Sequence, residues 1–109
     1  MKPISPLRYP GGKSRLCPLI SNSLKANSIR PNLFVEPFAG GAAVSLYLLT
    51  NDLVDEILLV DLDPMIASFW ELVFSDDVEW LIAKIKSCEI NLETWDKLNK
   101  DPGSTKREL

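Results

Sequence analysis

An apolar segment runs directly into a glycine pair in Phe34-Val35-Glu36-Pro37-Phe38-Ala39-Gly40-Gly41. The run Leu33–Val35 predicts a strand that is covered on both faces, and 42–49 predicts a helix after the glycines. Glycines at such a turn let the backbone approach a ligand and leave N–H groups free at the start of the helix. The turn therefore predicts a ligand site beside Glu36. The alternative is a plain tight turn in which Glu36 only caps the next helix.

A second apolar run, Glu56-Ile57-Leu58-Leu59-Val60-Asp61, ends in an acid 21 positions after Gly40. A carboxylate at this spacing, at the tip of the next strand, is placed to accept hydrogen bonds from the hydroxyls of a ribose. The alternative is that Asp61 caps the following helix, but Asp63, which precedes Pro64, fits that role better. Because strand and helix alternate here, we expect a parallel sheet and an α/β fold.

The third informative segment, Leu7-Arg8-Tyr9-Pro10-Gly11-Gly12-Lys13-Ser14, lies upstream of both strands. Its prolines and glycines predict an extended arm that closes in a turn, followed by a helix over 14–26. A phosphate-binding P-loop fits poorly, because its first glycine would fall at Leu7. Lys13 is a candidate for binding an anionic group of a ligand, and Tyr9 offers a flat surface beside it.

The second half of the chain is predicted to be helical. Asp63 and Pro64 open a helix that runs to about residue 74, Asp76 and Glu79 form a capping box for the next, and a short helix surrounds Trp95. We expect three parts: a ligand-binding part over 1–75, a helical segment over 76–100 and a mobile tail over 101–109. Two strands are too few for a doubly wound sheet, so the fold is expected to be incomplete.

Composition narrows the class of protein. The 109 residues are 46% hydrophobic and 25% charged, as in one soluble domain, and no apolar run is long enough to span a membrane, so we expect a cytoplasmic protein. The chain has no histidine, which excludes histidine-based nucleophiles and histidine-containing metal sites. Its two cysteines form no metal-binding pattern, so no metal site is predicted.

The net charge of the chain is −3, yet the first 35 residues hold six basic residues and no acid. This segment faces either an anionic partner or simply solvent.

Taken together, the three motifs resemble the start of the Dam-type, D12-class adenine-specific DNA N6-methyltransferases. That family has an aromatic-x-Gly-Gly-Lys segment, then Glu-Pro-Phe-x-Gly, then an apolar strand that ends in Asp. The matching residues here are Tyr9-Pro10-Gly11-Gly12-Lys13, Glu36-Pro37-Phe38-Ala39-Gly40 and Leu59-Val60-Asp61. The resemblance covers roughly residues 5–75, and three motifs at family-like spacing make it specific.

The resemblance implies a Rossmann-like fold that binds S-adenosylmethionine and transfers its methyl group to N6 of adenine in double-stranded DNA. The implied cofactor-binding residues are Tyr9, Lys13, Glu36, Phe38, Gly40 and Asp61. Tyr9 and Lys13 would lie at the methionine end and Asp61 at the ribose, which agrees with the roles derived above from the residues themselves.

One family motif, Asp-Pro-Pro-Tyr, which holds the adenine amino group, does not occur in these 109 residues. The Asp-Pro pairs continue as Asp63-Pro64-Met65-Ile66 and Asp101-Pro102-Gly103-Ser104. No catalytic residue is therefore assigned, and we expect the chain to be inactive alone. The alternatives are a non-catalytic module that binds S-adenosylmethionine or another adenosine ligand, and one half of a split methyltransferase. A complementing chain or self-association through the unfinished sheet is possible in either case.

Overall fold

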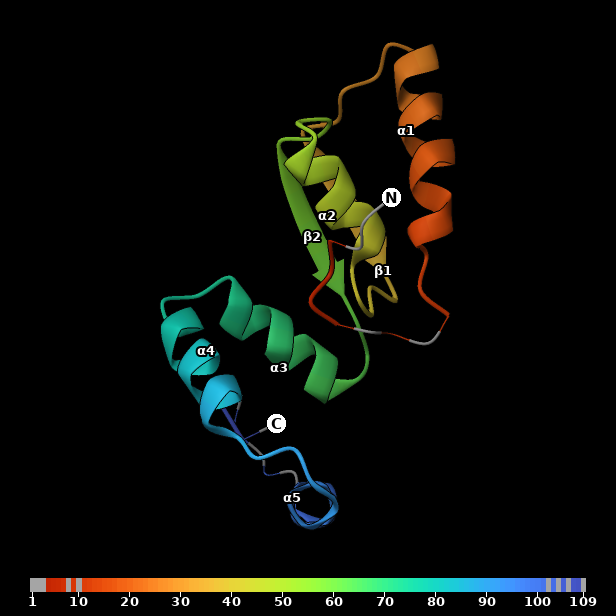
Figure 1. Cartoon of the computed structure of the whole chain (residues 1–109). Coiled ribbons are helices and arrows are strands. Elements are labelled where there is room, and N and C mark those ends of the chain that lie inside the picture. Colours follow the sequence, from red (N-terminus) through yellow and green to blue (C-terminus); the bar gives the residue numbers. More distant parts are fainter. Residues whose placement is uncertain are drawn as a thin grey trace. The chain divides into compact units, whose positions relative to one another are not determined.

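The computed structural model describes residues 4–7, 9, 11–101, 103, 105, 107 and 108. The chain divides into two compact units, Met1–Leu62 and Asp63–Leu109. Each unit is described by itself below, with the element labels of Figure 1.

The described residues of the first unit form a parallel pair of strands and two α-helices. Its elements are η1 (Ser14–Leu16, a 3₁₀ turn), α1 (Cys17–Ala26), β1 (Leu33–Pro37), α2 (Ala43–Thr50) and β2 (Glu56–Val60). The strands pair in parallel, from Leu33 opposite Glu56 to Pro37 opposite Val60. The predicted α/β class is confirmed in this form, a two-stranded parallel sheet with helices. The helix expected over 14–26 begins as the 3₁₀ turn, and Pro18 is accommodated in the first turn of α1.

Helix α2 lies between the sheet and α1, as Figure 1 shows, and it contacts both strands and α1. The buried cluster at this junction consists of Cys17, Val44, Leu48 and Val54. Val44 and Leu48 are four residues apart and so lie on one face of α2. The core of the first unit therefore depends on one helix that is apolar on most of its surface.

The other face of the sheet differs from the prediction. We expected the first strand to be covered on both faces, but Leu33 and Val35 of β1 and Leu58 and Val60 of β2 are exposed. The alternation along each strand explains this pattern, because successive side chains point to opposite faces and the contacts of α2 serve only one of them. A continuous apolar run is nevertheless typical of strands that are buried on both faces.

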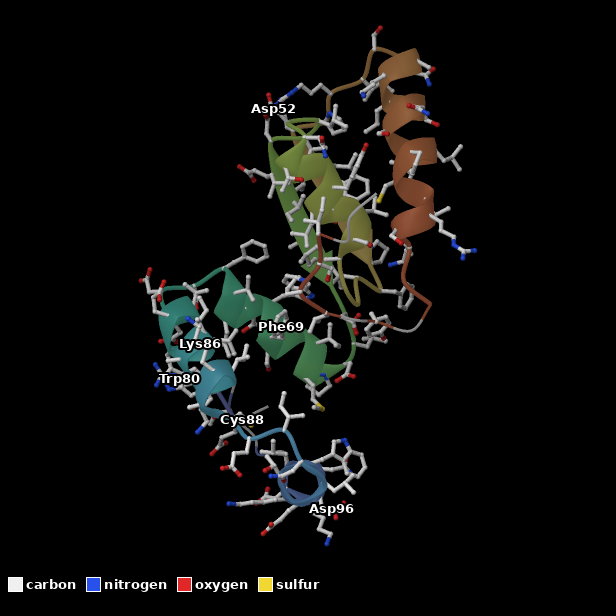
Figure 2. All side chains as sticks on the ribbon, in the orientation of Figure 1. Asp52, Phe69, Trp80, Lys86, Cys88 and Asp96 are labelled. Carbon is white, nitrogen blue, oxygen red and sulfur yellow. The ribbon has the colours of Figure 1, made fainter. Side chains whose placement is uncertain are left out.

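The loop at the end of α2 far from the glycine turn is held by Arg30. Its guanidinium pairs with Asp52 (2.7 Å) and with Asp55, and its Nε donates to the Asp52 carbonyl oxygen at 3.2 Å. Figure 2 shows Asp52 at this end of α2. Arg30 is thus a basic residue of the N-terminal segment that has a structural role. It stabilises the loop in which the chain turns from α2 into β2.

The second unit contains α3 (Pro64–Val73), α4 (Val78–Ser87) and α5 (Leu92–Lys100). The predicted cap of α3 is confirmed, since the Asp63 side chain accepts a hydrogen bond from the Met65 N–H at 2.9 Å. Helix α3 contacts α4, and the short helix expected around Trp95 is α5. Asn91 caps α5 by accepting from the Thr94 N–H at 2.8 Å.

The capping box predicted at Asp76 and Glu79 is wrong. Helix α4 begins one residue later than expected, and its N-cap, Asp77, makes no capping hydrogen bond. Asp77 pairs instead with Arg107 at 2.6 Å, and the Arg107 guanidinium lies 4.7 Å from the ring centre of Trp80, which Figure 2 shows on α4. The Asp77 carboxylate is therefore engaged by an ion pair that is distant in sequence and not by the helix N–H groups. Arg107 belongs to the tail predicted over residues 101–109. Residues 102, 104, 106 and 109 of this tail lie outside the described residues.

In the part of the chain that the structure describes, no helix has the length and apolar character needed to cross a membrane.

Candidate functional site

The two strands of the first unit end at the same edge of the sheet, and the candidate site is built there. Pro37 and Val60 are paired at this edge, so Phe38 and Asp61 leave the sheet side by side. The Ala39 N–H donates to the Val60 carbonyl oxygen, and the Gly40 N–H donates to Asp61 Oδ2, both at 2.9 Å. Asp61 therefore ties the glycine turn to the tip of β2 while remaining partly exposed.

The backbone of the turn adopts a left-handed conformation at alternate residues. The φ angles are 54° at Phe38, 50° at Gly40 and 53° at Ala42. Glycine accepts such angles readily, but a side chain makes them unfavourable, so Phe38 and Ala42 are strained. Strain of this kind persists where the surrounding structure enforces it, and it concentrates at binding sites. The left-handed conformation at Phe38 directs its ring outward, and 71% of the residue is exposed.

The N-terminal segment reaches this turn through Tyr9. A Cβ atom on Gly40 would lie 2.8 Å from Cδ1 and Cε1 of the Tyr9 ring, so the ring rests directly on the Gly40 backbone. The Tyr9 carbonyl oxygen accepts a hydrogen bond from the Gly12 N–H at 3.1 Å, which closes the predicted turn before Lys13. Gly40 is thus required twice, for its φ angle and for the close approach of Tyr9.

Lys13 joins the same segment to β1. Its Nζ donates to the Phe38 carbonyl oxygen at 2.6 Å and to Glu36 Oε2 at 3.1 Å. Glu36 is buried, with 4% of the residue exposed, and its other oxygen, Oε1, accepts from the N–H and the hydroxyl of Ser45. The ion pair accounts for a carboxylate that would otherwise be costly to bury.

A cavity of about 270 Å³ opens among these groups. Its described lining consists of Tyr9, Gly11, Gly12, Lys13, Phe38, Ala39, Gly41, Ala42, Ala43 and Asp61. Four of the six predicted site residues, Tyr9, Lys13, Phe38 and Asp61, are among them. Glu36 and Gly40 are not, because Glu36 lies behind Lys13, to which its carboxylate is bonded, and the Tyr9 ring covers Gly40. Pro10 of the first motif lies outside the described residues.

Two further features define the chemistry available. Cys17 is buried near Glu36, and burial, together with the negative charge of Glu36, raises the pKa of its thiol, so it remains a protonated core residue. Among the described residues, no three cysteine or acidic side chains are grouped to hold a metal ion. The site therefore offers an ammonium, a carboxylate, two aromatic rings and backbone N–H groups.

Sequence reasoning missed Ser45. It lies at the third position of α2, is completely buried, and makes both of its hydrogen bonds to Glu36. A signal existed, since Ala42 before the helix has no side chain able to cap it, so a free N–H of the first turn needed an acceptor from elsewhere. That signal identifies a need for an acceptor but not the partner.

The sequence of the chain was compared with models of known protein families. The family model for D12 class N6 adenine-specific DNA methyltransferases matches residues 9–102 of the 109-residue chain. The chain belongs to this family. No curated protein and no solved structure shows significant similarity to it.

Membership of the D12 family confirms the resemblance seen in the three motifs and supports a role in adenine-N6 methylation of DNA. The match extends beyond the first unit through α3, α4 and α5, which lie within residues 9–102. All three motifs contribute to the cavity or its immediate support, so the features that relate this chain to the family also converge in space.

Proposed function

We propose that the cavity binds S-adenosylmethionine, and that the chain is the cofactor-binding part of a DNA adenine-N6 methyltransferase with a Rossmann-like sheet. One observation carries the proposal: Lys13, Phe38 and Asp61 come from three separate segments, the N-terminal segment, the glycine turn and the end of β2, and line a single cavity. This position, outside the carboxyl ends of parallel strands, is where open α/β sheets bind ligands.

The chemistry of the lining suits the parts of this cofactor. The Lys13 ammonium is suited to the carboxylate of the methionine end, and the Tyr9 and Phe38 rings to the sulfonium and apolar portions. Asp61 is suited to the ribose hydroxyls, and Gly40 supports the Tyr9 ring that covers it. The cavity volume, about 270 Å³, is close to the lower end of ligand pockets, about 300 Å³.

The substrate proposed for the complete activity is double-stranded DNA with the target adenine turned out of the helix. In that reaction the methyl group would pass from the sulfonium sulfur of S-adenosylmethionine to N6 of adenine. S-adenosylhomocysteine would be left, and N6 would lose one proton. Since the 109 residues contain no Asp-Pro-Pro-Tyr motif to hold that amino group, we propose that the chain alone binds the cofactor without transferring methyl. The same absence favours a second candidate, one half of a split enzyme or a non-catalytic module that binds S-adenosylmethionine.

Calorimetric titration of S-adenosylmethionine tests the site. Asp61→Asn keeps an oxygen that can accept from the Gly40 N–H but removes the charge, so we expect the affinity to fall at least about tenfold. Asp63→Asn is the matched control, because Asn also caps helices and Asp63 does not line the described part of the cavity. Equal affinities for the two variants would contradict the assignment of Asp61.

Incubation with a labelled methyl donor and adenine-containing DNA tests the other half of the proposal. The chain alone should leave the DNA unlabelled even where calorimetry detects binding. Methylated adenine in that reaction would show that the chain carries its own means of holding the base. Labelling that appears only after a chain with an Asp-Pro-Pro-Tyr motif is added would identify a split enzyme.

A further inference from the structure

Glu36 occupies an unusual place for a residue in a ligand-binding motif. It is the buried member of β1, with its side chain on the sheet face that α2 covers, and it does not belong to the described lining of the cavity. Both of its oxygens are engaged by protein groups: Oε1 by Ser45 and Oε2 by Lys13. Its contacts are therefore those of a supporting group, because among the described residues its carboxylate bonds to one cavity-lining side chain, Lys13.

Ser45 fixes the orientation of this carboxylate. Its N–H (3.0 Å) and its hydroxyl (2.6 Å) both donate to Oε1, and the residue has no exposed surface. The N–H belongs to the first turn of α2, where helix N–H groups have no partner within the helix and favour a negative charge. With Oε1 held twice, Oε2 is left to face Lys13.

The Lys13 ammonium is held in turn by two acceptors, Glu36 Oε2 and the Phe38 carbonyl oxygen, and about a third of its side chain is exposed. An ammonium has three N–H donors, so these two partners among the described residues leave one N–H for a ligand. Lysine is among the side chains that lose most rotamer freedom when fixed. Fixing it before binding removes that loss from the binding step.

We infer that Glu36 and Ser45 are positioning residues, which hold the Lys13 ammonium at the cavity wall to receive the carboxylate at the amino-acid end of the ligand. The inference rests on the proposed function. It assigns Glu36 an action through Lys13 rather than a contact with the cofactor, and it gives Ser45 a role in selecting ligands that carry an amino-acid group.

Two physical effects make opposite predictions for Glu36→Gln. If Glu36 were only a competing counter-charge, its neutralisation would leave Lys13 more attractive to a carboxylate, and affinity would rise. If Glu36 positions Lys13, affinity falls. The amide has one oxygen, which the two Ser45 donors occupy, so its NH₂ group faces the ammonium and cannot accept from it.

The experiment is a pair of calorimetric titrations of the full chain with two thioethers. S-adenosylhomocysteine and 5′-methylthioadenosine share the adenosine and the sulfur, and only the first carries the amino-acid end. We expect Glu36→Gln to weaken S-adenosylhomocysteine by about tenfold and Ser45→Ala by about threefold, while 5′-methylthioadenosine changes less than about twofold for both variants.

Ser21→Ala is the matched control. Ser21 is also buried, and its hydroxyl donates to the Pro18 carbonyl oxygen of its own helix at 3.2 Å, away from Glu36. Its removal tests the loss of a buried serine hydroxyl as such, and both ligands should bind this variant as they bind the unmodified chain.

The other outcomes are distinct. An equal loss for both ligands in Glu36→Gln shows a purely structural role, and a gain for S-adenosylhomocysteine shows a competing counter-charge; either overturns the inference. If circular dichroism shows that the unmodified chain is folded and it binds neither ligand, the proposed cofactor site itself fails and the inference fails with it. If it binds both and the variants do not discriminate between them, only the inference fails.

Discussion

At the scale of single residues, Gly40 is the position where sequence, backbone and site meet. Its φ angle of 50° disfavours any side chain, and the Tyr9 ring lies where a Cβ atom would be. Gly11 offers a comparison, because it has a φ angle of 72° and, its chain neighbours aside, no described residue has an atom within 4 Å of the position of a Cβ. The two glycines separate the effect of backbone strain from the effect of crowding.

Gly40→Ala is expected to destabilise the chain by about 1–2 kcal/mol through the left-handed backbone, and to displace the Tyr9 ring from the cavity wall. Gly11→Ala should show a similar loss of stability and a smaller loss of S-adenosylmethionine affinity, because Gly11 lines the cavity but its added methyl group does not displace Tyr9. Gly40→Ala should lower the affinity by at least about tenfold. Urea denaturation and calorimetry measure the two quantities. Similar affinities for the two variants would mean that Tyr9 does not contribute to binding.

At the scale of elements, local capping rules succeeded at α3 and failed at α4. Asp63 precedes a proline at the first position of α3 and caps the helix as predicted. Asp76 and Glu79 have the spacing of a capping box, yet the cap position is Asp77, whose carboxylate pairs with Arg107, thirty residues away. A spacing rule considers only neighbours along the chain, so it does not register a competing partner that is distant in sequence.

Asp63→Ala should therefore destabilise α3 by about 1 kcal/mol, the usual effect of removing an N-cap. Asp76→Ala is the matched control and should change stability by less than about 0.5 kcal/mol, as for an exposed residue without a special role. Hydrogen exchange of the α3 and α4 amides measures both effects locally. Faster exchange in α4 for Asp76→Ala would show that Asp76 does cap this helix, as the capping-box spacing predicts.

At the scale of the whole molecule, the first unit has the buried apolar cluster, whereas α4 and α5 of the second unit contain no buried residue among those described. Leu48 is completely buried beside Cys17, while Leu62, at the end of the same unit, is 87% exposed. The two cysteines report on different places, since Cys17 is buried and Cys88 is exposed. Their reactivity offers a way to follow the core without any ligand.

Leu48→Ala should lower the free energy of unfolding by about 2–5 kcal/mol, because it leaves a cavity in the core. Alkylation of Cys17 should accelerate strongly in this variant, while Cys88 reacts quickly in every variant and serves as an internal reference. Leu62→Ala is the matched control and should leave both rates unchanged. Mass spectrometry of the labelled peptides measures each rate. A Cys17 rate in Leu48→Ala that equals that of the unmodified chain would contradict the proposed core.

The sequence by itself determined the local features. Apolar runs defined both strands, proline and aspartate defined the start of α3, and three motifs defined the family and four residues that line the cavity, Tyr9, Lys13, Phe38 and Asp61. These succeeded because each depends on residues close together in the chain, or on a fixed spacing across one strand-turn-helix unit.

Tertiary structure decided which groups bind one another. The contact of Glu36 with Ser45, the approach of Tyr9 to Gly40 and the bond between Gly40 and Asp61 each join different elements. So does the contact that makes Glu36 a support for Lys13 instead of part of the cavity wall. Such pairings depend on how the sheet, α2 and the N-terminal segment pack together. A buried carboxylate requires partners for its charge, but only the packing determines which partners it finds.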